Sequence, residues 1–229
     1  MRQTIRSSVI KGRRTVLPLF FAVAIFSVSA RAQAVFSSLQ SASVLKPKQL
    51  EVTPDFSAVV ILSEDEGLEH VWNTFGVQLG VGITKRLEIR VRYAYLDRMD
   101  GYTTNSIISF GPKIGLAKNV LSFYLPVEFK LSGCDVESMD TSNIQPTLML
   151  NAPVAKRFEI NPAVKVSIPF HAVKIASPYQ RTQVAVDLGF GIFLGHSKNL
   201  VIRPEAGALF VGGGSFWQFS VGFGVRTKN

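Results

Sequence analysis

The residues FGVQLGVGITKRLEIRVRYAY, at positions 75–95, decide the fold of this chain. Every second residue is apolar in two runs, 75–83 and 87–95, which are separated by a polar triplet at 84–86. Successive side chains of a β-strand point to opposite faces, so a period of two predicts strands with one apolar and one polar face. Two such runs joined by a short polar turn predict an antiparallel hairpin.

The alternation repeats along the rest of the chain and predicts an all-β fold of about ten strands. Short turns that contain lysine or arginine recur at residues 84–86, 117–119, 155–157 and 197–199, and longer polar segments separate the other strands. Such spacing is typical of an antiparallel up-and-down β-barrel. The predicted strands are residues 48–62, 73–84, 87–97, 105–117, 120–132, 143–155, 158–172, 182–195, 200–211 and 215–227.

The first 34 residues have the pattern of a cleaved export signal. Five basic residues precede an uncharged stretch at 15–30, and Ala-Gln-Ala at 32–34 supplies a small-x-small cleavage site. An N-terminal membrane anchor is the alternative, but the stretch is shorter than the roughly 20 residues that a transmembrane helix needs. We therefore expect a signal peptide, a periplasmic N-terminal segment and an outer-membrane barrel, at residues 1–34, 35–47 and 48–229 respectively.

Alternation alone does not say what covers the apolar face. A soluble β-sandwich buries that face against a second sheet, whereas a membrane barrel turns it toward lipid. Lipid is favoured because the runs match the roughly 9–11 residues of a membrane-crossing strand. The opposite face is rich in glycine, which suits a crowded interior. Aromatic residues also gather toward the longer loops, as in interfacial girdles; they are Trp72, Phe75, Tyr93, Tyr95, Phe129, Phe170, Phe210, Phe216 and Trp217.

The polar face of the predicted strands carries seven acidic and seven basic residues. Equal numbers of opposite charges are what a narrow lumen requires, because a confined charge must be paired or bear a large desolvation penalty. No charge falls within the predicted apolar face. We therefore predict a lumen charge network made of Glu51, Asp55, Glu88, Arg90, Arg92, Lys113, Glu128, Lys130, Glu159, Lys165, Asp187, Arg203, Glu205 and Arg226.

Eight prolines lie inside the predicted strands, although proline cannot donate a hydrogen bond to a neighbouring strand. A closed barrel has no edge strand where such a residue is readily tolerated. We expect bulges, strand ends or local breaks at these positions, and eight or twelve strands are alternatives to ten. The prolines are Pro54, Pro112, Pro126, Pro146, Pro153, Pro162, Pro169 and Pro204.

The signal, the asymmetry between short turns and longer loops, and the glycine-rich alternation resemble those of small bacterial outer-membrane β-barrel proteins. The segments GITKRLEIR (82–90) and FGPKIGL (110–116) are similar to hairpin motifs of the phenol-degradation-pathway transporter-like barrels. The resemblance implies a monomeric transmembrane barrel in the bacterial outer membrane. Its expected partners are outer-membrane lipid and, during biogenesis, the barrel-assembly machinery.

The sequence predicts no catalytic residue, metal or cofactor. Ser167 and His171 both face the predicted lumen, but four residues of strand separate them by about 13 Å, too far for a nucleophile and its base. The acidic residues at 64–66 lack the ligand spacing of a calcium loop. One cysteine, Cys134, excludes a disulfide framework and a Cys-based zinc site.

The formal net charge of +9 invites a nucleic-acid interpretation. Six of the basic residues and none of the acidic ones lie in residues 1–34, so the mature chain would carry +3. We therefore expect no nucleic-acid partner. The expected function is a narrow pore or transporter for small or hydrophobic solutes. A structural or surface-interaction barrel without transport activity is the alternative.

Overall fold

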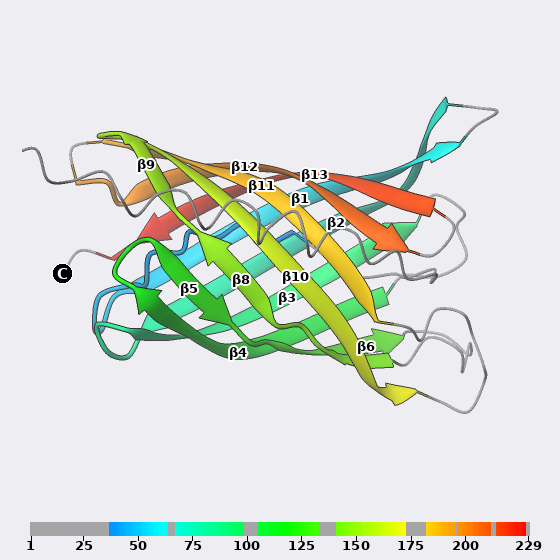
Figure 1. Ribbon diagram of the computed structural model, residues 1–229, viewed down its shortest axis with the longest axis horizontal. Coiled ribbons are helices and arrows are strands. Elements are labelled where there is room, and N and C mark those ends of the chain that lie inside the picture. Colours follow the sequence, from blue (N-terminus) through cyan, green and yellow to red (C-terminus); the bar gives the residue numbers. More distant parts are fainter. Residues whose placement is uncertain are drawn as a thin grey trace, which may run out of the picture.

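The computed structural model describes a closed antiparallel β-barrel (Figure 1). The described residues are 37–63, 67–98, 105–132, 141–172, 182–195, 197–211 and 214–227. Among them, no helix is long and apolar enough to cross a membrane. The strands are β1(Leu50–Ser63), β2(Gly67–Gly82), β3(Leu87–Arg98), β4(Asn105–Ala117), β5(Leu121–Tyr124), β6(Val127–Ser132), β7(Thr141–Ile144), β8(Thr147–Leu150), β9(Ala152–Ala155), β10(Phe158–Ala172), β11(Gln183–Leu194), β12(Leu200–Val211) and β13(Gly214–Arg226).

These strands occupy ten positions around the barrel wall. Strands β5 and β6 are two pieces of the fifth position and both pair with β4, while β7, β8 and β9 are three pieces of the sixth and all pair with β10. The ring closes because β13 pairs with β1 and β10 pairs with β11. Every pairing is antiparallel, and the prediction of ten strands is confirmed.

The predicted short turns join β2 to β3, β4 to β5, β9 to β10 and β11 to β12, all at one end of the barrel (Figure 1). We call this the short-turn end and the opposite one the loop end. The turn residues Lys85, Arg86, Lys118, Lys156, Arg157 and Lys198 are exposed. The acidic residues at 64–66, the signal at 1–34 and Cys134 lie outside the described residues.

Each of the eight strand prolines lies at an interruption of a ladder, as expected. Pro126 separates β5 from β6, and Pro146 separates β7 from β8. Pro54 lies in a gap of the β1–β13 ladder and Pro204 in a gap of the β11–β12 ladder, while each keeps its pairing on the other side. The other four prolines lie at register shifts or where a strand changes partner; they are Pro112, Pro153, Pro162 and Pro169. The wall therefore accommodates the missing N–H groups without opening.

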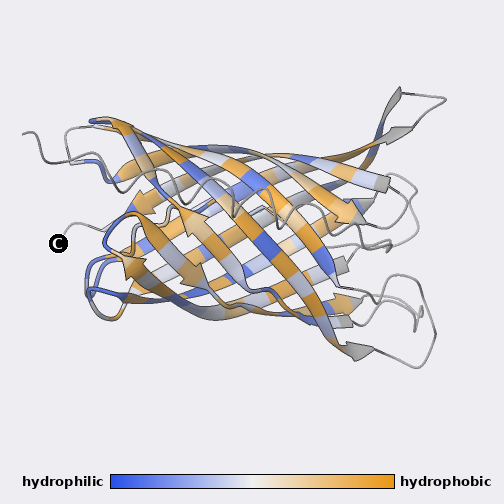
Figure 2. Ribbon diagram, viewed as in Figure 1, coloured by the Kyte–Doolittle hydropathy of each residue, from blue (hydrophilic) through white to orange (hydrophobic). Residues whose placement is uncertain are grey.

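The two faces of the wall differ in the way that the alternation predicts, and the apolar and polar residues alternate along the strands in Figure 2. Large apolar side chains point outward and are exposed, for example Leu79 and Phe223 at about half of their surface. Seven predicted girdle residues are also exposed: Phe75, Tyr93, Tyr95, Phe129, Phe170, Phe210 and Trp217. The prediction is wrong for Trp72, which is buried, and for Phe216, which packs against it inside the barrel.

Residues 37–45 lie inside the barrel, and we call them the lumen segment. Ser37, Ser38, Leu39, Gln40, Ser41, Ala42 and Leu45 are all buried. A turn at residues 46–49 then leads the chain into β1: the Gln49 N–H donates to the Lys46 carbonyl (2.9 Å) and the Lys48 N–H to the Gly82 carbonyl (2.8 Å). The sequence analysis expects a periplasmic segment at 35–47. Residues 37–45 of that segment lie inside the barrel, where buried charges of the wall bind their main chain.

Candidate functional site

The lumen is the candidate site, and the structure places the predicted charge network around it. Twelve of the fourteen side chains are buried, and Lys130 and Arg226 are half-buried. The fourteen do not form one cluster. They divide along the barrel axis into a group near the short-turn end, a group in the middle and a few separately bound residues.

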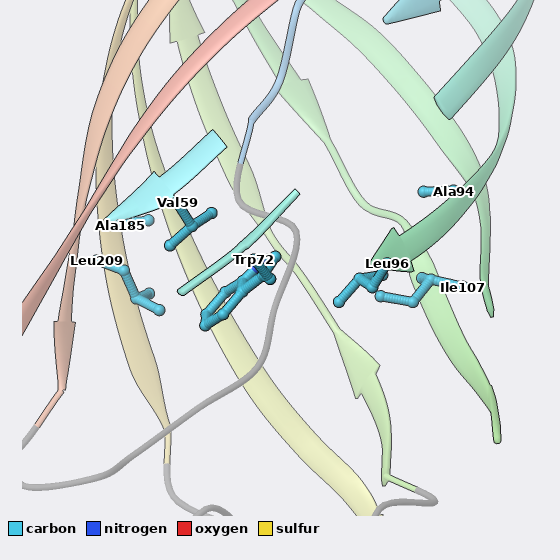
Figure 3. Packing of buried hydrophobic residues seen from close by; sticks show 7 residues of the cluster. All are labelled: Val59, Trp72, Ala94, Leu96, Ile107, Ala185 and Leu209. Atoms are coloured by element: carbon cyan, nitrogen blue, oxygen red, sulfur yellow. The ribbon is translucent and has the colours of Figure 1, made fainter. Parts of the chain in front are cut away.

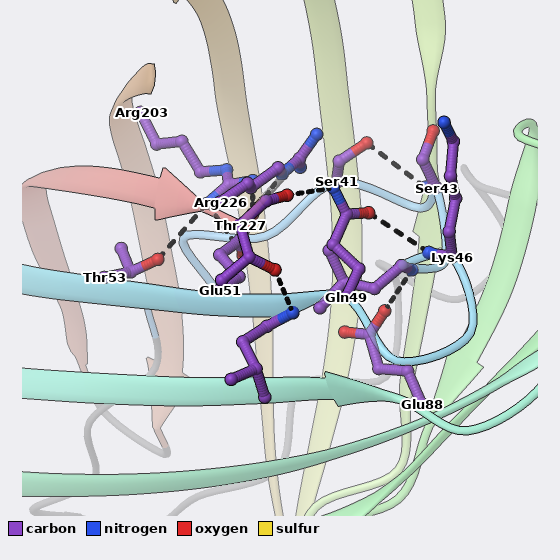
Figure 4. Close-up of polar contacts among 12 residues, drawn as sticks. Ser41, Ser43, Lys46, Gln49, Glu51, Thr53, Glu88, Arg203, Arg226 and Thr227 are labelled. Carbon is purple, nitrogen blue, oxygen red and sulfur yellow. Dashed lines mark hydrogen bonds and ion pairs between the residues drawn. The ribbon is translucent and has the colours of Figure 1, made fainter. Parts of the chain in front are cut away.

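The group near the short-turn end, which we call the Glu51 layer, is held together by ion pairs within the wall. Glu51 binds Arg203 at 2.9 Å and Arg226 at 2.5 Å (Figure 4). It also binds Arg90 at 2.9 Å. Glu88 binds Arg90 as well and Lys113 at 3.3 Å. The layer therefore consists of Glu51, Glu88, Arg90, Lys113, Arg203 and Arg226.

The middle group, which we call the Glu205 layer, depends on the lumen segment for its partners. Both oxygens of Glu205 accept main-chain hydrogen bonds, from the N–H of Ser38 (2.7 Å) and of Leu39 (2.8 Å). Asp187 accepts a hydrogen bond from the Ser38 hydroxyl at 3.4 Å. Lys165 interacts electrostatically with both carboxylates. Arg92 binds Asp55 at 2.5 Å and completes the layer.

The other predicted residues lie apart from these two layers. Glu128 accepts a hydrogen bond from Asn143, and Glu159 accepts one from Asn161, each at 3.3 Å. Lys130 interacts electrostatically with Glu128. These three side chains occupy the same inward face but take no part in holding the lumen segment in the contacts that the structure describes.

Toward the loop end the lumen becomes apolar. Inward-facing side chains there form a buried cluster, in which Trp72 packs with its ring centroid 5.6 Å from that of Phe216. The cluster residues are Val59, Trp72, Ala94, Leu96, Ile107, Ala185 and Leu209 (Figure 3). Trp72 has the same strand parity as Thr74 and Gln78, so the alternation itself indicates its inward position. The short-turn end and the middle of the lumen are therefore charged, and the loop end is apolar.

Sequence reasoning missed the lumen segment as part of the site. Two signals point to it in retrospect: its residues are mostly small and polar, and glycines of the wall lie along its path. A Cβ atom at Gly80 would lie 3.1 Å from Leu45, one at Gly115 would lie 3.1 Å from Val44, and one at Gly222 would lie 3.5 Å from Leu39. The glycine-rich face therefore serves the segment as well as the inward-facing charges.

A small cavity, about 20 Å³ in volume, lies beside the lumen segment. Its lining includes Ser37, Gln40, Arg92, Tyr124, Gln145 and Lys165. A cavity of this size holds about one water molecule. Some buried polar atoms of the lining, such as Gln40 Oε1 and Gln145 Nε2, have no protein partner, which fits a hydrated space.

The one serine–histidine pair that the sequence analysis considers lies on β10. Ser167 is buried on β10, and His171 lies four residues further along the same strand. The side chain of His171 is outside the described part of the structure. Among the described residues, no group of three or more His, Cys, Asp or Glu side chains is placed to hold a metal ion.

No protein-family model and no curated protein matches this sequence. Solved structures do match in fold. An outer membrane channel from Pseudomonas putida F1 shares 6% identity over 85% of this chain and 100% of its own, with a TM-score of 0.52. The translocator domain of the autotransporter NalP from Neisseria meningitidis shares 10% identity over 78% of this chain and 88% of its own, with a TM-score of 0.44. The outer membrane protein OprG from Pseudomonas aeruginosa shares 10% identity over 83% and 100%, with a TM-score of 0.35.

The similarity to the Pseudomonas putida channel agrees with the architecture derived above. The chain is a closed ten-stranded antiparallel barrel whose fold is that of outer-membrane β-barrel proteins. At 6% identity the likeness concerns the fold alone.

Proposed function

We propose that this chain is a monomeric outer-membrane β-barrel that passes small solutes through its lumen, and that the lumen segment closes this path in the conformation described. The proposal includes export by the signal at 1–34 and insertion by the barrel-assembly machinery. The observation that carries it is the way in which the segment is held. The wall binds it through side chains, so it can leave the lumen without breaking a backbone ladder.

The outer face supports a membrane location. Apolar side chains on neighbouring strands, such as Leu79, Val91 and Phe110, are each more than 40% exposed. A continuous apolar surface of this kind is unfavourable in water but is what a lipid-facing barrel presents. The exposed aromatic residues toward the loop end fit a membrane interface.

The lumen itself favours small solutes. Residues of the lumen segment such as Leu39 and Ser41 are buried inside the barrel, and the cavity beside the segment has room for about one water molecule. Passage along the path that the segment occupies therefore requires the segment to move. A ten-stranded barrel has little interior space beyond its own side chains. The buried charges of the Glu51 and Glu205 layers favour polar solutes, whereas the apolar cluster near the loop end is where a hydrophobic solute would first bind.

A structural barrel without transport activity is the second candidate. The observation that favours it is the thorough pairing of the Glu51 layer, which fills the lumen near the short-turn end with ion pairs. In that case the lumen segment would be a permanent part of the interior.

Membrane location is tested by fractionating cells and comparing the gel mobility of heated and unheated protein. We expect the protein in the outer-membrane fraction, with a faster-migrating folded form before heating. A soluble periplasmic protein would contradict both candidate functions.

Transport is tested by conductance in planar bilayers. We expect the mature chain to be closed or to open briefly, and a chain lacking residues 37–45 to show steady discrete channels. The full-length double variant Glu88→Gln and Glu205→Gln provides a second measurement, because it weakens the binding of the lumen segment without shortening the chain. Its channels should open more often than those of the unmodified mature chain. If all three proteins fold yet none conducts, the barrel is structural.

A further inference from the structure

The lumen binds the main chain of residues 37–45 at five points. On the donor side, the N–H groups of Ser38 and Leu39 donate to Glu205, and that of Leu45 donates to Glu88 at 2.8 Å. On the acceptor side, Arg92 donates to the Ser37 carbonyl and Lys113 to the Ser43 carbonyl, each at 3.0 Å. Carboxylates of the wall thus accept hydrogen bonds from N–H groups of the segment, and cations of the wall donate hydrogen bonds to its carbonyl groups.

These contacts match a peptide in both signs of charge. Glu205 accepts from two successive N–H groups, one on each oxygen, which is a bidentate arrangement of charge-assisted hydrogen bonds. Each of the four charged residues is at most 7% exposed. A buried charge that loses such a partner bears a large penalty, so the lumen needs a ligand that supplies both N–H donors and carbonyl acceptors.

The side chains of the segment are held with less selectivity. Three serine hydroxyls make hydrogen bonds of 3.0–3.4 Å to the wall. The Ser38 hydroxyl donates to Asp187, the Ser37 hydroxyl bonds with Ser57 and Arg92, and the Ser43 hydroxyl accepts from Asn151. The apolar side chains of Leu39, Val44 and Leu45 lie against glycines of the wall. A glycine provides room for a side chain without selecting its shape, so other sequences would fit the same path.

A simple cation or anion would satisfy this lumen less well. An amine or guanidinium solute could bind Glu205 and Asp187 but would leave Arg92 and Lys113 without their carbonyl partners. A carboxylate solute would have the opposite defect. A ligand that carries both N–H donors and carbonyl acceptors at intervals along its length can bind all four side chains, which are Glu205, Glu88, Arg92 and Lys113.

We propose that the lumen is a main-chain recognition site for short peptides, which residues 37–45 occupy within the same chain. This inference rests on the proposed transport function and names the class of solute. Peptides with small side chains are the expected solutes, since the path is lined by glycines and is as narrow as the segment itself.

The first experiment uses the chain lacking residues 37–45, folded as judged by heat-modifiable gel mobility, in planar bilayers. The peptide SSLQSASVL, with both ends capped, is added as a channel blocker. A scrambled peptide of the same composition should block within about threefold of it, because recognition is through the main chain. An analogue N-methylated at the residues equivalent to Ser38 and Leu39 should block roughly 100-fold more weakly, because two hydrogen bonds to a buried carboxylate are lost.

Two matched variants locate the site. Glu205→Gln in the shortened chain should weaken peptide block by roughly tenfold, since a neutral amide accepts hydrogen bonds less strongly than a carboxylate. Glu159→Gln alters an acid on the same inward face that makes no described contact with the segment, and it should leave the block unchanged. An equal effect of both variants would contradict recognition at Glu205.

If the shortened chain does not fold, the full-length chain gives the same information. Ser41 is buried in the lumen segment, so Ser41→Cys in a Cys134→Ser background should react slowly with a thiol reagent. Added peptide, native or scrambled, should speed this labelling by displacing the segment, and the N-methylated analogue should not.

The outcomes separate this inference from the proposed function. Channels that open in the shortened chain but are blocked only by the native peptide would make residues 37–45 a dedicated plug, which overturns peptide recognition and leaves transport intact. Channels that no peptide blocks would also overturn it. A folded shortened chain that never conducts would overturn the transport function itself.

Discussion

Glu51 and Glu205 are both buried carboxylates on the inward face of the same wall, yet they are satisfied in different ways. Glu51 is bound by three arginines from β3, β12 and β13. Glu205 is bound by main-chain N–H groups of the lumen segment, far from it in sequence. One carboxylate is therefore held by the barrel itself and the other by a segment that no backbone ladder fixes in place.

The difference shows how one lumen can be both rigid and able to open. A carboxylate such as Glu51, whose cationic partners all lie in the wall, stabilises the ring and is expensive to remove, because the loss of one partner leaves buried charges uncompensated. A carboxylate such as Glu205, whose main-chain partners come from a separate segment, can exchange them for water or for a solute.

Glu51→Ala should have the largest effect on stability. It leaves Arg90, Arg203 and Arg226 close together inside the barrel without their shared carboxylate, and the loss of one partner of a buried ion pair costs about 3–5 kcal/mol. The measurement is the free energy of unfolding in phospholipid vesicles, from a urea titration followed by tryptophan fluorescence.

Glu159→Ala is the control for this prediction. Glu159 is buried on the same face, but its described contact is one hydrogen bond from Asn161, so its loss should cost about 1 kcal/mol. Equal losses for the two variants would show that the arginine cluster adds nothing to the stability of the wall.

Gly82→Ala should have an intermediate effect at the turn that connects the lumen segment to β1. A Cβ atom at Gly82 would collide with the carbonyl oxygen of Lys46, which belongs to the backbone and cannot rotate away. We expect a loss of about 1–3 kcal/mol, as for other overpacked sites, together with faster thiol labelling of Ser41→Cys.

Gly115→Ala is the matched variant for that turn. The nearest atom to its Cβ would be Val44 Cγ2, at 3.1 Å, at the end of a side chain that can adjust. Its effect on stability and on labelling should be smaller than that of Gly82→Ala. A larger effect of Gly115→Ala than of Gly82→Ala would show that the turn at residues 46–49 is not what fixes the lumen segment to the wall.

The wall was predictable from the sequence because the patterns that indicate strands and turns involve residues close together in the chain. Alternation fixes which side of a strand faces outward, and the basic turns fix where hairpins reverse. The proline positions even indicated the breaks: Pro126 and Pro146 divide two strand positions into pieces. The prediction is wrong for Trp72 because its position near the loop end suggests the outer girdle, whereas its parity with Thr74 puts it inside.

The site was only partly predictable, because partners in a lumen are distant in sequence. The inward position of residues such as Glu51 and Glu205 follows from parity. Nothing local distinguishes the acid that binds three arginines from the acid that binds the N–H groups of Ser38 and Leu39, more than 160 residues away. Residues 37–45 show no alternation, so their position inside the barrel had no periodic signal.

Ser38→Ala should have the smallest effect of these substitutions. It removes the hydroxyl that donates to Asp187 at 3.4 Å but keeps the N–H that donates to Glu205 at 2.7 Å. We expect a loss of at most about 0.5–1 kcal/mol and an open probability in planar bilayers that changes by less than about threefold. Ser38→Pro removes that N–H and should raise the open probability by roughly tenfold, because Glu205 then loses one of its two main-chain partners. If Ser38→Ala opened the barrel as much as Ser38→Pro, side chains rather than the main chain would hold the lumen segment. The Glu205 layer would then bind one particular sequence and not peptides in general.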